Sequence, residues 1–203
     1  MSHDIRVRAH TIQLEQEPDN RARSNNAQKC PDHALVFDCE SRITADQMLT
    51  FGFWRFCERR NDRYVPVEEG IFHDDGLRGN EIAVLRDFAK AYKAEVDNDG
   101  CSRIRVYSRS KFVAEVLGLA IQAKAFIVCF NSGFDLSRIA VDWETAKNGG
   151  WSLILSKWRN PRTRELKPNK FFPRIVVKAL NSKTSIIHST RAPMSERGRK
   201  TKK

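Results

Sequence analysis

Ala-Leu-Val-Phe-Asp-Cys-Glu-Ser, residues 34–41, is an apolar run that ends in two acidic residues, Asp38 and Glu40. Side chains of a β-strand alternate between its faces, so residues two apart project from the same side. The two carboxylates are therefore expected side by side near the end of a buried strand. Paired negative charges in apolar surroundings are costly unless a cation lies between them, and divalent ions prefer carboxylate oxygens. The stretch thus predicts a metal site.

Composition indicates one globular domain with tails. The chain has 203 residues, of which 40% are hydrophobic, enough to bury one sizeable core. Residues 1–10 contain no continuous apolar segment, so we expect neither a signal peptide nor a membrane span, and a cytoplasmic location. Five cysteines without Cys-x-x-Cys spacing, three of them inside apolar strand-like runs, are expected to be reduced thiols in the core.

Positive charge is concentrated at the C-terminal end of the chain. Residues 1–150 hold 21 Lys and Arg against 23 Asp and Glu, whereas residues 151–203 hold 15 against 2. A nucleic acid is the natural partner for this last quarter. A disordered basic tail is the alternative for residues 191–203, but it fits residues 151–189 poorly because aromatic and aliphatic residues interleave with the charges there.

Apolar spacing predicts a meander of antiparallel strands followed by alternating helices and strands. After a flexible polar leader, residues 1–33, the expected strands are residues 35–40, 47–58 and 64–72, the last at a sheet edge because it contains Pro66. Next we expect a helix over residues 80–96 capped by Gly79-Asn80, a strand at 103–107, and a helix capped by Ser110. A central strand at 125–130, buried on both faces, and a helix from Asp135 that carries Trp143 are expected to follow.

A second polar motif, Asn131-Ser-Gly-Phe-Asp135, connects the apolar run 125–130 to the following helix pattern. Open α/β sheets bind ligands at such strand-to-helix turns, at the carboxyl ends of strands. Beyond it we expect a break at Gly149-Gly150, a basic loop over residues 157–170, and a hairpin with arms at 174–180 and 184–189. The predicted organisation is a core of residues 34–148, an extension of residues 149–190 and a disordered tail of residues 191–203.

The two motifs and the element order together resemble a known family. The order of elements is that of an α/β RNase H-like fold, a mixed β-sheet flanked by helices with the acidic pair on its first, central strand. Asp38-Cys-Glu40 is similar to the first motif of the DEDD (DnaQ-like) 3′–5′ exonuclease superfamily, and Asn131-Ser-Gly-Phe134-Asp135 to the second. The Asn-x-x-Phe-Asp form is most similar to the proofreading domains of family B DNA polymerases.

The resemblance implies metal-dependent hydrolysis of a terminal phosphodiester. Two Mg²⁺ or Mn²⁺ ions about 4 Å apart would perform it, one activating water and the other stabilising the leaving oxygen. By this resemblance Asp38 bridges both ions, Glu40 binds the ion that activates water, and Asp135 binds the other. Asn131 and Phe134 would shape the turn and the wall beside the substrate strand.

The third motif of the family, a Tyr or His followed by a fourth Asp on a later helix, has no counterpart here. After Asp142 and Glu144 the chain has only two acidic residues, Glu165 and Glu196. Asp142, expected two helical turns after Asp135 on a similar face, would lie on the same helix, whereas the family takes its fourth ligand from a separate one. The domain therefore resembles a truncated one, for which a partner or a downstream chain would supply the missing carboxylate.

Other readings of these residues remain open or are disfavoured. Taken alone, Asn131 is explained as a turn residue and Asp135 as a charge at a helix N-terminus. The histidines and cysteines form no zinc-ligand spacing, and Ser132-Gly133 lacks the flanking glycine of a nucleophile elbow. Trp54 and Trp143 are expected in the core. Trp151 and Trp158, near Lys157 and Arg159, are expected either to stack on unpaired bases or to form an apolar lid.

The sequence thus predicts an exonuclease-like domain acting on single-stranded ends of DNA or RNA with Mg²⁺ or Mn²⁺. Its candidate catalytic and metal-binding residues are Asp38, Glu40 and Asp135, and its candidate substrate-binding residues are Asn131, Phe134, Trp151, Lys157, Trp158 and Arg159. The alternative is a catalytically inactive nucleic-acid-binding or regulatory fragment that keeps the same fold.

Overall fold

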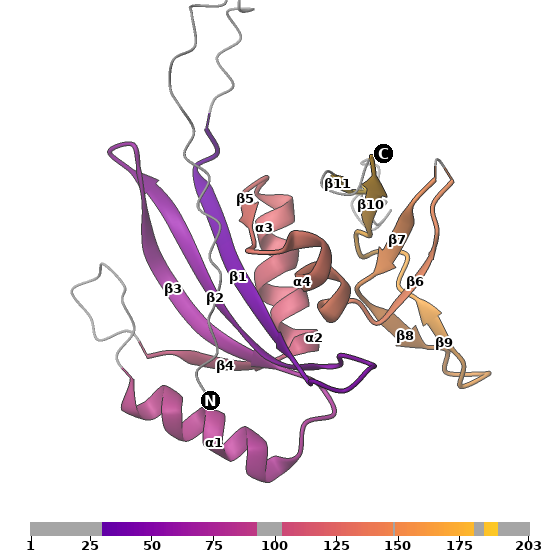
Figure 1. Ribbon diagram of the computed structural model, residues 1–203, viewed down its shortest axis with the longest axis horizontal. Helices are drawn as coiled ribbons and strands as arrows, with labels where there is room; N and C mark the ends of the chain where they lie inside the picture. The colour runs from indigo at the N-terminus through magenta and orange to yellow at the C-terminus, as the bar shows by residue number, and fades with distance from the viewer. Residues whose placement is uncertain (1–29, 93–102, 148, 181–184, 191–203) are drawn as a thin grey trace, which may run out of the picture. The chain divides into compact units, whose positions relative to one another are not determined.

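The computed structural model describes residues 30–92, 103–147, 149–180 and 185–190, and these form a mixed α/β structure. The first sheet has the strand order β4-β3-β2-β1-β5, and a second has the order β11-β10-β7-β6 (Figure 1). A separate two-stranded hairpin consists of β8 and β9. No helix among the described residues is both long and apolar enough to cross a bilayer.

The expected antiparallel meander is confirmed. It consists of β1 (His33–Ser41), β2 (Leu49–Arg60) and β3 (Arg63–His73), with Phe37 opposite Trp54 and Trp54 opposite Gly70. The short strand β4 (Arg105–Ser108) pairs in parallel with only the second half of β3. Pro66 lies in the first half of β3, which β4 does not pair with, so its missing N–H costs no hydrogen bond to β4. Its partner on β2 is Cys57, next to the register shift between Phe56 and Cys57.

Strand β5 (Phe126–Val128) corrects the prediction of a central strand buried on both faces. It pairs in parallel with β1, through Ala34–Val36, and lies at the edge of the sheet. Phe126 and Val128 are half-exposed and Phe130 is 98% exposed. An apolar run alone does not distinguish an interior strand from an edge strand, because a neighbouring strand is a tertiary feature.

Helices cover both faces of the first sheet (Figure 1). Helix α1 (Gly79–Ala91) lies on one face, and the continuous segment α2 (Arg109–Phe112), η1 (Val113–Leu117), α3 (Gly118–Gln122) lies on the other. The caps differ from the predicted ones. Ser108, not Ser110, accepts a hydrogen bond from the Lys111 N–H, and α1 begins after Arg78, whose N–H donates to Glu81. Predicted helical residues 93–96 lie outside the described residues.

The core lies between the first sheet and the α2–α3 segment. The Phe72 and Phe112 rings stack with centroids 4.1 Å apart, and Phe37 packs edge-on against Phe112 at 5.6 Å. Trp54 is 3% exposed, as predicted. The same cluster includes Leu153, Leu155, Ile175 and Val177, so the second sheet and the segment after β7 contribute to the same core.

The region after Asp135 is reorganised relative to the sequence prediction. Helix α4 (Ser132–Ile139) ends before Asp142, and the chain then forms β6 (Asp142–Thr145) and β7 (Trp151–Ile154). Trp143 was expected in the core on the helix, but it lies on β6 and is 61% exposed. Asp142 is likewise on a strand, so it does not share a helical face with Asp135.

The C-terminal strands follow the prediction in one place and depart from it in another. The hairpin of β10 (Ile175–Ala179) and β11 (Ser185–Ser189) is confirmed, while its turn, residues 181–184, lies outside the described residues. The expected basic loop is instead a hairpin of β8 (Lys157–Arg159) and β9 (Leu166–Pro168). A turn in which the Asn160 N–H donates to the Glu165 carbonyl connects these two strands.

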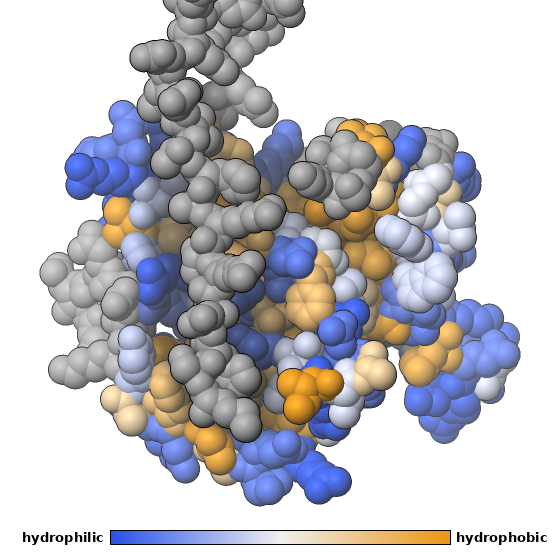
Figure 2. All heavy atoms as spheres, in the orientation of Figure 1, coloured by the Kyte–Doolittle hydropathy of each residue, from blue (hydrophilic) through white to orange (hydrophobic). Residues whose placement is uncertain are grey.

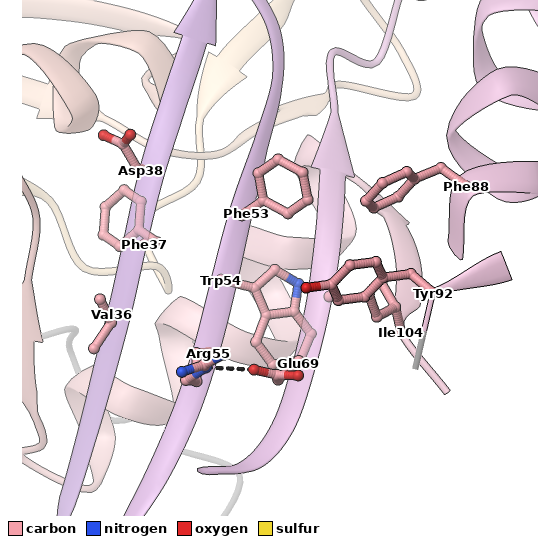
Figure 3. A pocket seen from close by; sticks show the side chains of 11 residues that line it. Val36, Phe37, Asp38, Phe53, Trp54, Arg55, Glu69, Phe88, Tyr92 and Ile104 are labelled. Carbon is pink, nitrogen blue, oxygen red and sulfur yellow. Dashed lines mark ion pairs between the residues drawn. The ribbon is translucent and has the colours of Figure 1, made fainter. Parts of the chain in front are cut away.

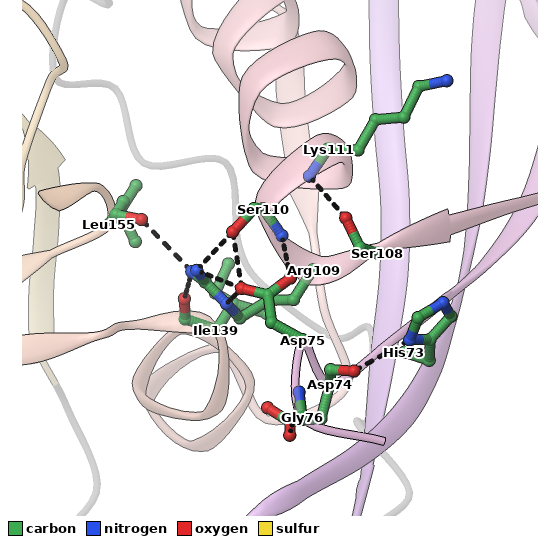
Figure 4. Close-up of polar contacts among 10 residues, drawn as sticks. All are labelled: His73, Asp74, Asp75, Gly76, Ser108, Arg109, Ser110, Lys111, Ile139 and Leu155. Atoms are coloured by element: carbon green, nitrogen blue, oxygen red, sulfur yellow. Dashed lines mark hydrogen bonds and ion pairs between the residues drawn. The ribbon is translucent and has the colours of Figure 1, made fainter. Parts of the chain in front are cut away.

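Arg109, the first residue of α2, ties the two sheets together (Figure 4). Its guanidinium donates to Asp75 after β3, to the Ile139 carbonyl at the end of α4, and to the Leu155 carbonyl after β7. The Arg109 side chain is only 9% exposed. Burial alone would raise the pKa of Asp75, but hydrogen bonds from Ser110 and Arg109 outweigh it and hold that pKa below its usual range.

Replacing Arg109 with Met is expected to lower the free energy of unfolding by about 3–5 kcal/mol, because it leaves a partly buried carboxylate and two carbonyls without a donor. Arg105→Met is the matched control, since Arg105 forms a more exposed ion pair with Glu68 and should cost about 1 kcal/mol or less. Urea unfolding followed by circular dichroism measures both. Equal losses in the two variants would contradict a structural role for the Arg109 contacts.

Candidate active site

The strands β1, β3, β4 and β5 run in the same direction, so their carboxyl ends lie together at one end of the first sheet. We call this end the carboxyl edge, and the sequence motifs converge there. Asp38 and Glu40 lie near the end of β1, and the Asn131–Asp135 turn follows β5. This is the position at which α/β sheets bind ligands, and the predicted location of the second motif is confirmed.

Asp135 is buried, at 1% exposure, and backbone groups hold both of its oxygens. Oδ1 accepts a hydrogen bond from the Cys39 N–H at 3.1 Å, and Oδ2 accepts one from the Asn131 N–H at 3.1 Å. The Cys39 thiol donates to the Asp135 carbonyl at 3.5 Å. These contacts attach the first turn of α4 directly to β1, between Asp38 and Glu40.

Asn131 has the turn role expected of it. It is the N-cap of α4, and its side-chain oxygen accepts a hydrogen bond from the Phe134 N–H at 3.4 Å. Its own N–H fixes the Asp135 carboxylate, so Asn131 both begins the helix and orients the acid. Phe134 is half-buried, and its ring lies 5.0 Å from the Arg138 guanidinium.

The carboxylates of Asp38 and Asp135 lie close enough to interact, although the two residues are far apart along the chain. Burial raises the pKa of Asp135, the two backbone N–H donors lower it, and the Asp38 carboxylate raises it again through its charge and a hydrogen bond between the side chains. The net pKa is above its usual range. Two carboxylates in contact therefore meet in a partly desolvated place without enough positive charge to neutralise them.

Glu40 does not join this contact. It is exposed, and among the described residues its side chain makes no hydrogen bond or ion pair, although its backbone is paired with Phe51 in the sheet. Within the described ranges, no three His, Cys, Asp or Glu side chains gather into a group that could hold a metal ion. The structure thus brings together two of the three predicted ligands, Asp38 and Asp135.

The pair still suits a divalent cation. Each Asp135 oxygen accepts one backbone N–H and so keeps a lone pair, and Asp38 adds a second hard oxygen donor. Mg²⁺ commonly binds one or two carboxylates and completes its shell with water and substrate phosphate. The two side chains that would hold it are therefore Asp38 and Asp135.

Asp142 is not available as a further ligand. It is on β6, and its carboxylate forms an ion pair with Lys157 at 2.6 Å. The hydrogen bond from Lys157 and the one from the Trp143 N–H lower the pKa of Asp142. The same ion pair engages Lys157, which the sequence had suggested as a substrate contact.

Arg138 is a residue that the sequence reasoning missed. From α4 it donates to the carbonyls of Asp46 and Gln47 in the β1–β2 loop, where Gln47 has a left-handed backbone with φ 44°. Arg138 thus holds this loop against the helix that carries Asp135. Its position three residues after Asp135 was the available signal, but the sequence could not show what the guanidinium contacts.

A pocket of about 500 Å³ adjoins Asp38 on the face of the sheet opposite the core (Figure 3). Aromatic side chains from two elements face each other across it. Phe53 of β2 and Phe88 of α1 lie with ring centroids 6.2 Å apart, and Phe88 stacks on Tyr92 at 5.3 Å. The ion pair between Arg55 and Glu69 lines the same pocket. The lining of the pocket is therefore mostly aromatic and apolar, with one ion pair.

The remaining predicted substrate contacts are exposed but lie on the C-terminal strands. Trp151 is half-exposed on β7, and Trp158 and Arg159 are exposed on β8. Trp158 and Arg159 are adjacent in a strand, so they project from opposite faces of the hairpin. None of them lines the pocket beside Asp38.

Comparison with known proteins gives no match: no protein-family model, curated protein or solved structure resembles the chain significantly. The thiols beside the candidate site are poor nucleophiles, because burial raises the pKa of Cys39 far above its usual range and that of Cys129 to about 12. The candidate for chemistry at this end of the sheet is therefore the carboxylate pair.

Asp38→Asn is expected to raise the free energy of unfolding by about 0.5–2 kcal/mol at neutral pH, because it removes a charge that opposes Asp135. Asp135→Ala should lower it by about 1–3 kcal/mol, since the N–H groups of Cys39 and Asn131 lose their acceptor. Urea unfolding measures both.

The pH dependence of the Asp38→Asn effect tests its cause. A folded-state pKa above the unfolded value means that ionised Asp135 destabilises the fold at neutral pH, and that this penalty disappears as pH falls through that pKa. The advantage of Asp38→Asn should therefore shrink on acidification. An advantage independent of pH, or a loss of stability at neutral pH, would exclude charge repulsion between the two acids.

Proposed function

We propose that this protein is a metal-dependent nuclease domain of RNase H-like architecture that hydrolyses the terminal phosphodiester of single-stranded DNA or RNA. The observation that carries the proposal is the contact between Asp38 and Asp135. Two acids from distant parts of the chain meet at the carboxyl edge of a sheet, and backbone donors fix one of them. Such a costly arrangement suits a site that binds cations.

The role of each residue follows from its contacts. Asp135, held by Cys39 and Asn131, provides a carboxylate of fixed orientation, and exposed Asp38 faces both Asp135 and the aromatic pocket. When bound, Mg²⁺ or Mn²⁺ supplies activation of water and stabilisation of charge on the phosphate oxygens. Glu40, exposed two residues beyond Asp38 on β1, is the proposed acceptor of the proton of the attacking water.

The pocket beside Asp38 is the proposed place for the unpaired terminal bases. Phe53, Phe88 and Tyr92 offer ring faces on which bases stack whatever their sequence. A strand that entered there would bring its last phosphodiester toward Asp38, because the carboxylate lines the same pocket. The proposal takes the protein to act in the cytoplasm and leaves the choice between DNA and RNA open.

An inactive nucleic-acid-binding fragment is the second candidate. Two observations favour it. Glu40 does not reach Asp38 and Asp135, and among the described residues no third metal-ligating side chain joins that pair. A partner or downstream chain that adds a carboxylate would convert such a fragment into an enzyme. Hydrolysis and binding therefore have to be measured separately.

The first test is hydrolysis of a 5′-labelled single-stranded oligonucleotide with 5 mM Mn²⁺, with Mg²⁺, or with EDTA. We expect stepwise shortening from the 3′ end that requires metal and falls on the order of 10³-fold in Asp38→Asn. Asp62→Asn is the control, because Asp62 is an exposed acid whose left-handed backbone, φ 61°, suits Asn. Metal-dependent binding without shortening would support the second candidate, and equal activity in Asp38→Asn would reject the site.

The second test concerns the pocket. Phe53→Ala should weaken binding of a single-stranded oligonucleotide by about 1–3 kcal/mol, the usual value of one stacked base. Phe126→Ala is a matched control, because Phe126 on β5 is 43% exposed, Phe53 is 44% exposed, and only Phe53 lines the pocket. Fluorescence anisotropy with a labelled oligonucleotide measures the affinity. An equal effect of the two substitutions would place the strand elsewhere.

A further inference from the structure

The β8–β9 hairpin and its continuation to Lys170 carry a concentration of positive charge that the candidate active site does not use. Residues 157–170 contain six basic side chains and one acidic one, Glu165. Figure 2 shows hydrophilic residues gathered over this hairpin, away from the first sheet. A surface with this charge attracts a polyanion.

Two of the six basic side chains are neutralised by neighbouring acids and four are not. Lys157 pairs with Asp142 at 2.6 Å, and Lys167 pairs with Glu165 at 3.3 Å. Within the part of the chain that the structure describes, no carboxylate pairs with the exposed side chains of Arg159, Arg162, Arg164 and Lys170. These four keep their full charge for a ligand.

The tip of the hairpin has a fixed backbone. The Asn160 side-chain oxygen accepts hydrogen bonds from the N–H groups of Arg162, at 2.9 Å, and Thr163, at 3.4 Å. The Asn160 N–H donates to the Glu165 carbonyl at 2.9 Å, and the Arg164 N–H donates to the Asn160 carbonyl at 2.9 Å. Arg164 has a left-handed backbone, φ 60°, which a non-glycine residue adopts rarely. The turn therefore presents its arginines from defined positions.

The base of the hairpin is fixed as well. At the tip, the Arg159 side chain donates to the Arg164 carbonyl at 2.9 Å and so links the end of β8 to the turn. At the other end, the Asn169 N–H donates to the Ser156 carbonyl at 2.9 Å, and the Asn169 side chain accepts from the Phe171 N–H at 3.0 Å. Less conformational entropy is lost on binding when the backbone that carries the charged side chains is already held in place.

We propose that the β8–β9 hairpin is a phosphate-binding arm that grips the backbone of a nucleic acid through Arg159, Arg162 and Arg164. The identity of the partner rests on the proposed function, while the arm itself lies outside the aromatic pocket and the carboxylate pair. Guanidinium groups bind phosphate oxygens in a bidentate manner, and such contacts do not read the base sequence. The arm thus supplies affinity, and the carboxylate edge supplies chemistry.

The test compares the R159Q/R162Q/R164Q variant of the full chain with an R86Q/K124Q/K178Q control, which removes the same charge from exposed positions outside the arm. Binding of a labelled 20-nucleotide single strand is measured by anisotropy between 50 and 300 mM NaCl. We expect the arm variant to bind at least about tenfold more weakly at 50 mM NaCl. The slope of log K against log salt should fall in magnitude by about 2, roughly 0.7 for each lost phosphate contact. The control should change neither value appreciably.

Two further measurements separate this inference from the proposed function. Binding is also measured in EDTA, which removes any metal and stops hydrolysis, so a chain without nuclease activity still tests the arm. The R159K/R162K/R164K variant keeps the charge and should retain most of the binding and the salt slope. Equal affinities of the arm variant and the control would overturn the proposal. Tight binding of the wild type to vesicles with 30% phosphatidylserine, without binding to the oligonucleotide, would overturn it as well.

Discussion

The parallel pairing of β5 with β1 is the constraint on which the candidate site depends. Because both strands end at the same edge, the turn that follows β5 arrives beside the end of β1, and Asp135 reaches the Cys39 N–H. That hydrogen bond is also what places Asp135 beside Asp38. A shift of β5 by one residue would turn every side chain of the strand to the other face and separate the motifs.

A second constraint, the buried Arg109 side chain, holds the far end of the helix that carries Asp135. Arg109 joins the ends of β3, α4 and β7 through a side chain that is only 9% exposed, so the helix that carries Asp135 is held at both ends. Its first turn is bonded to β1, and the carbonyl of its last residue, Ile139, accepts a hydrogen bond from the Arg109 guanidinium. The stability cost of two neighbouring acids is thus offset by polar contacts elsewhere on the same helix.

The two proposals assign recognition and chemistry to different parts of the chain. The acids and the aromatic pocket belong to the first sheet and α1, and the unpaired arginines belong to a hairpin of the C-terminal segment. The charge asymmetry along the chain corresponds to this division, with the nearly neutral first part carrying the acids and the basic last part carrying the arm. Backbone contacts by arginine give affinity for any sequence, so both proposals describe a protein that acts without sequence preference.

The sequence by itself determined the local features. Alternation predicted the β1–β3 meander and placed Asp38 and Glu40 on one face of a strand, and turn chemistry placed Asn131 in the turn before a helix, although that helix begins at Ser132 and not at the predicted Asp135. Only the tertiary structure decided that β5 is an edge strand, that Asp142 and Trp143 leave the helix for β6, and that the basic loop is a hairpin. It also decided that Glu40 stays outside the contact of the other two acids. These outcomes depend on strand partners and on buried groups such as Arg109, which lie far away in sequence and leave no periodic signal there.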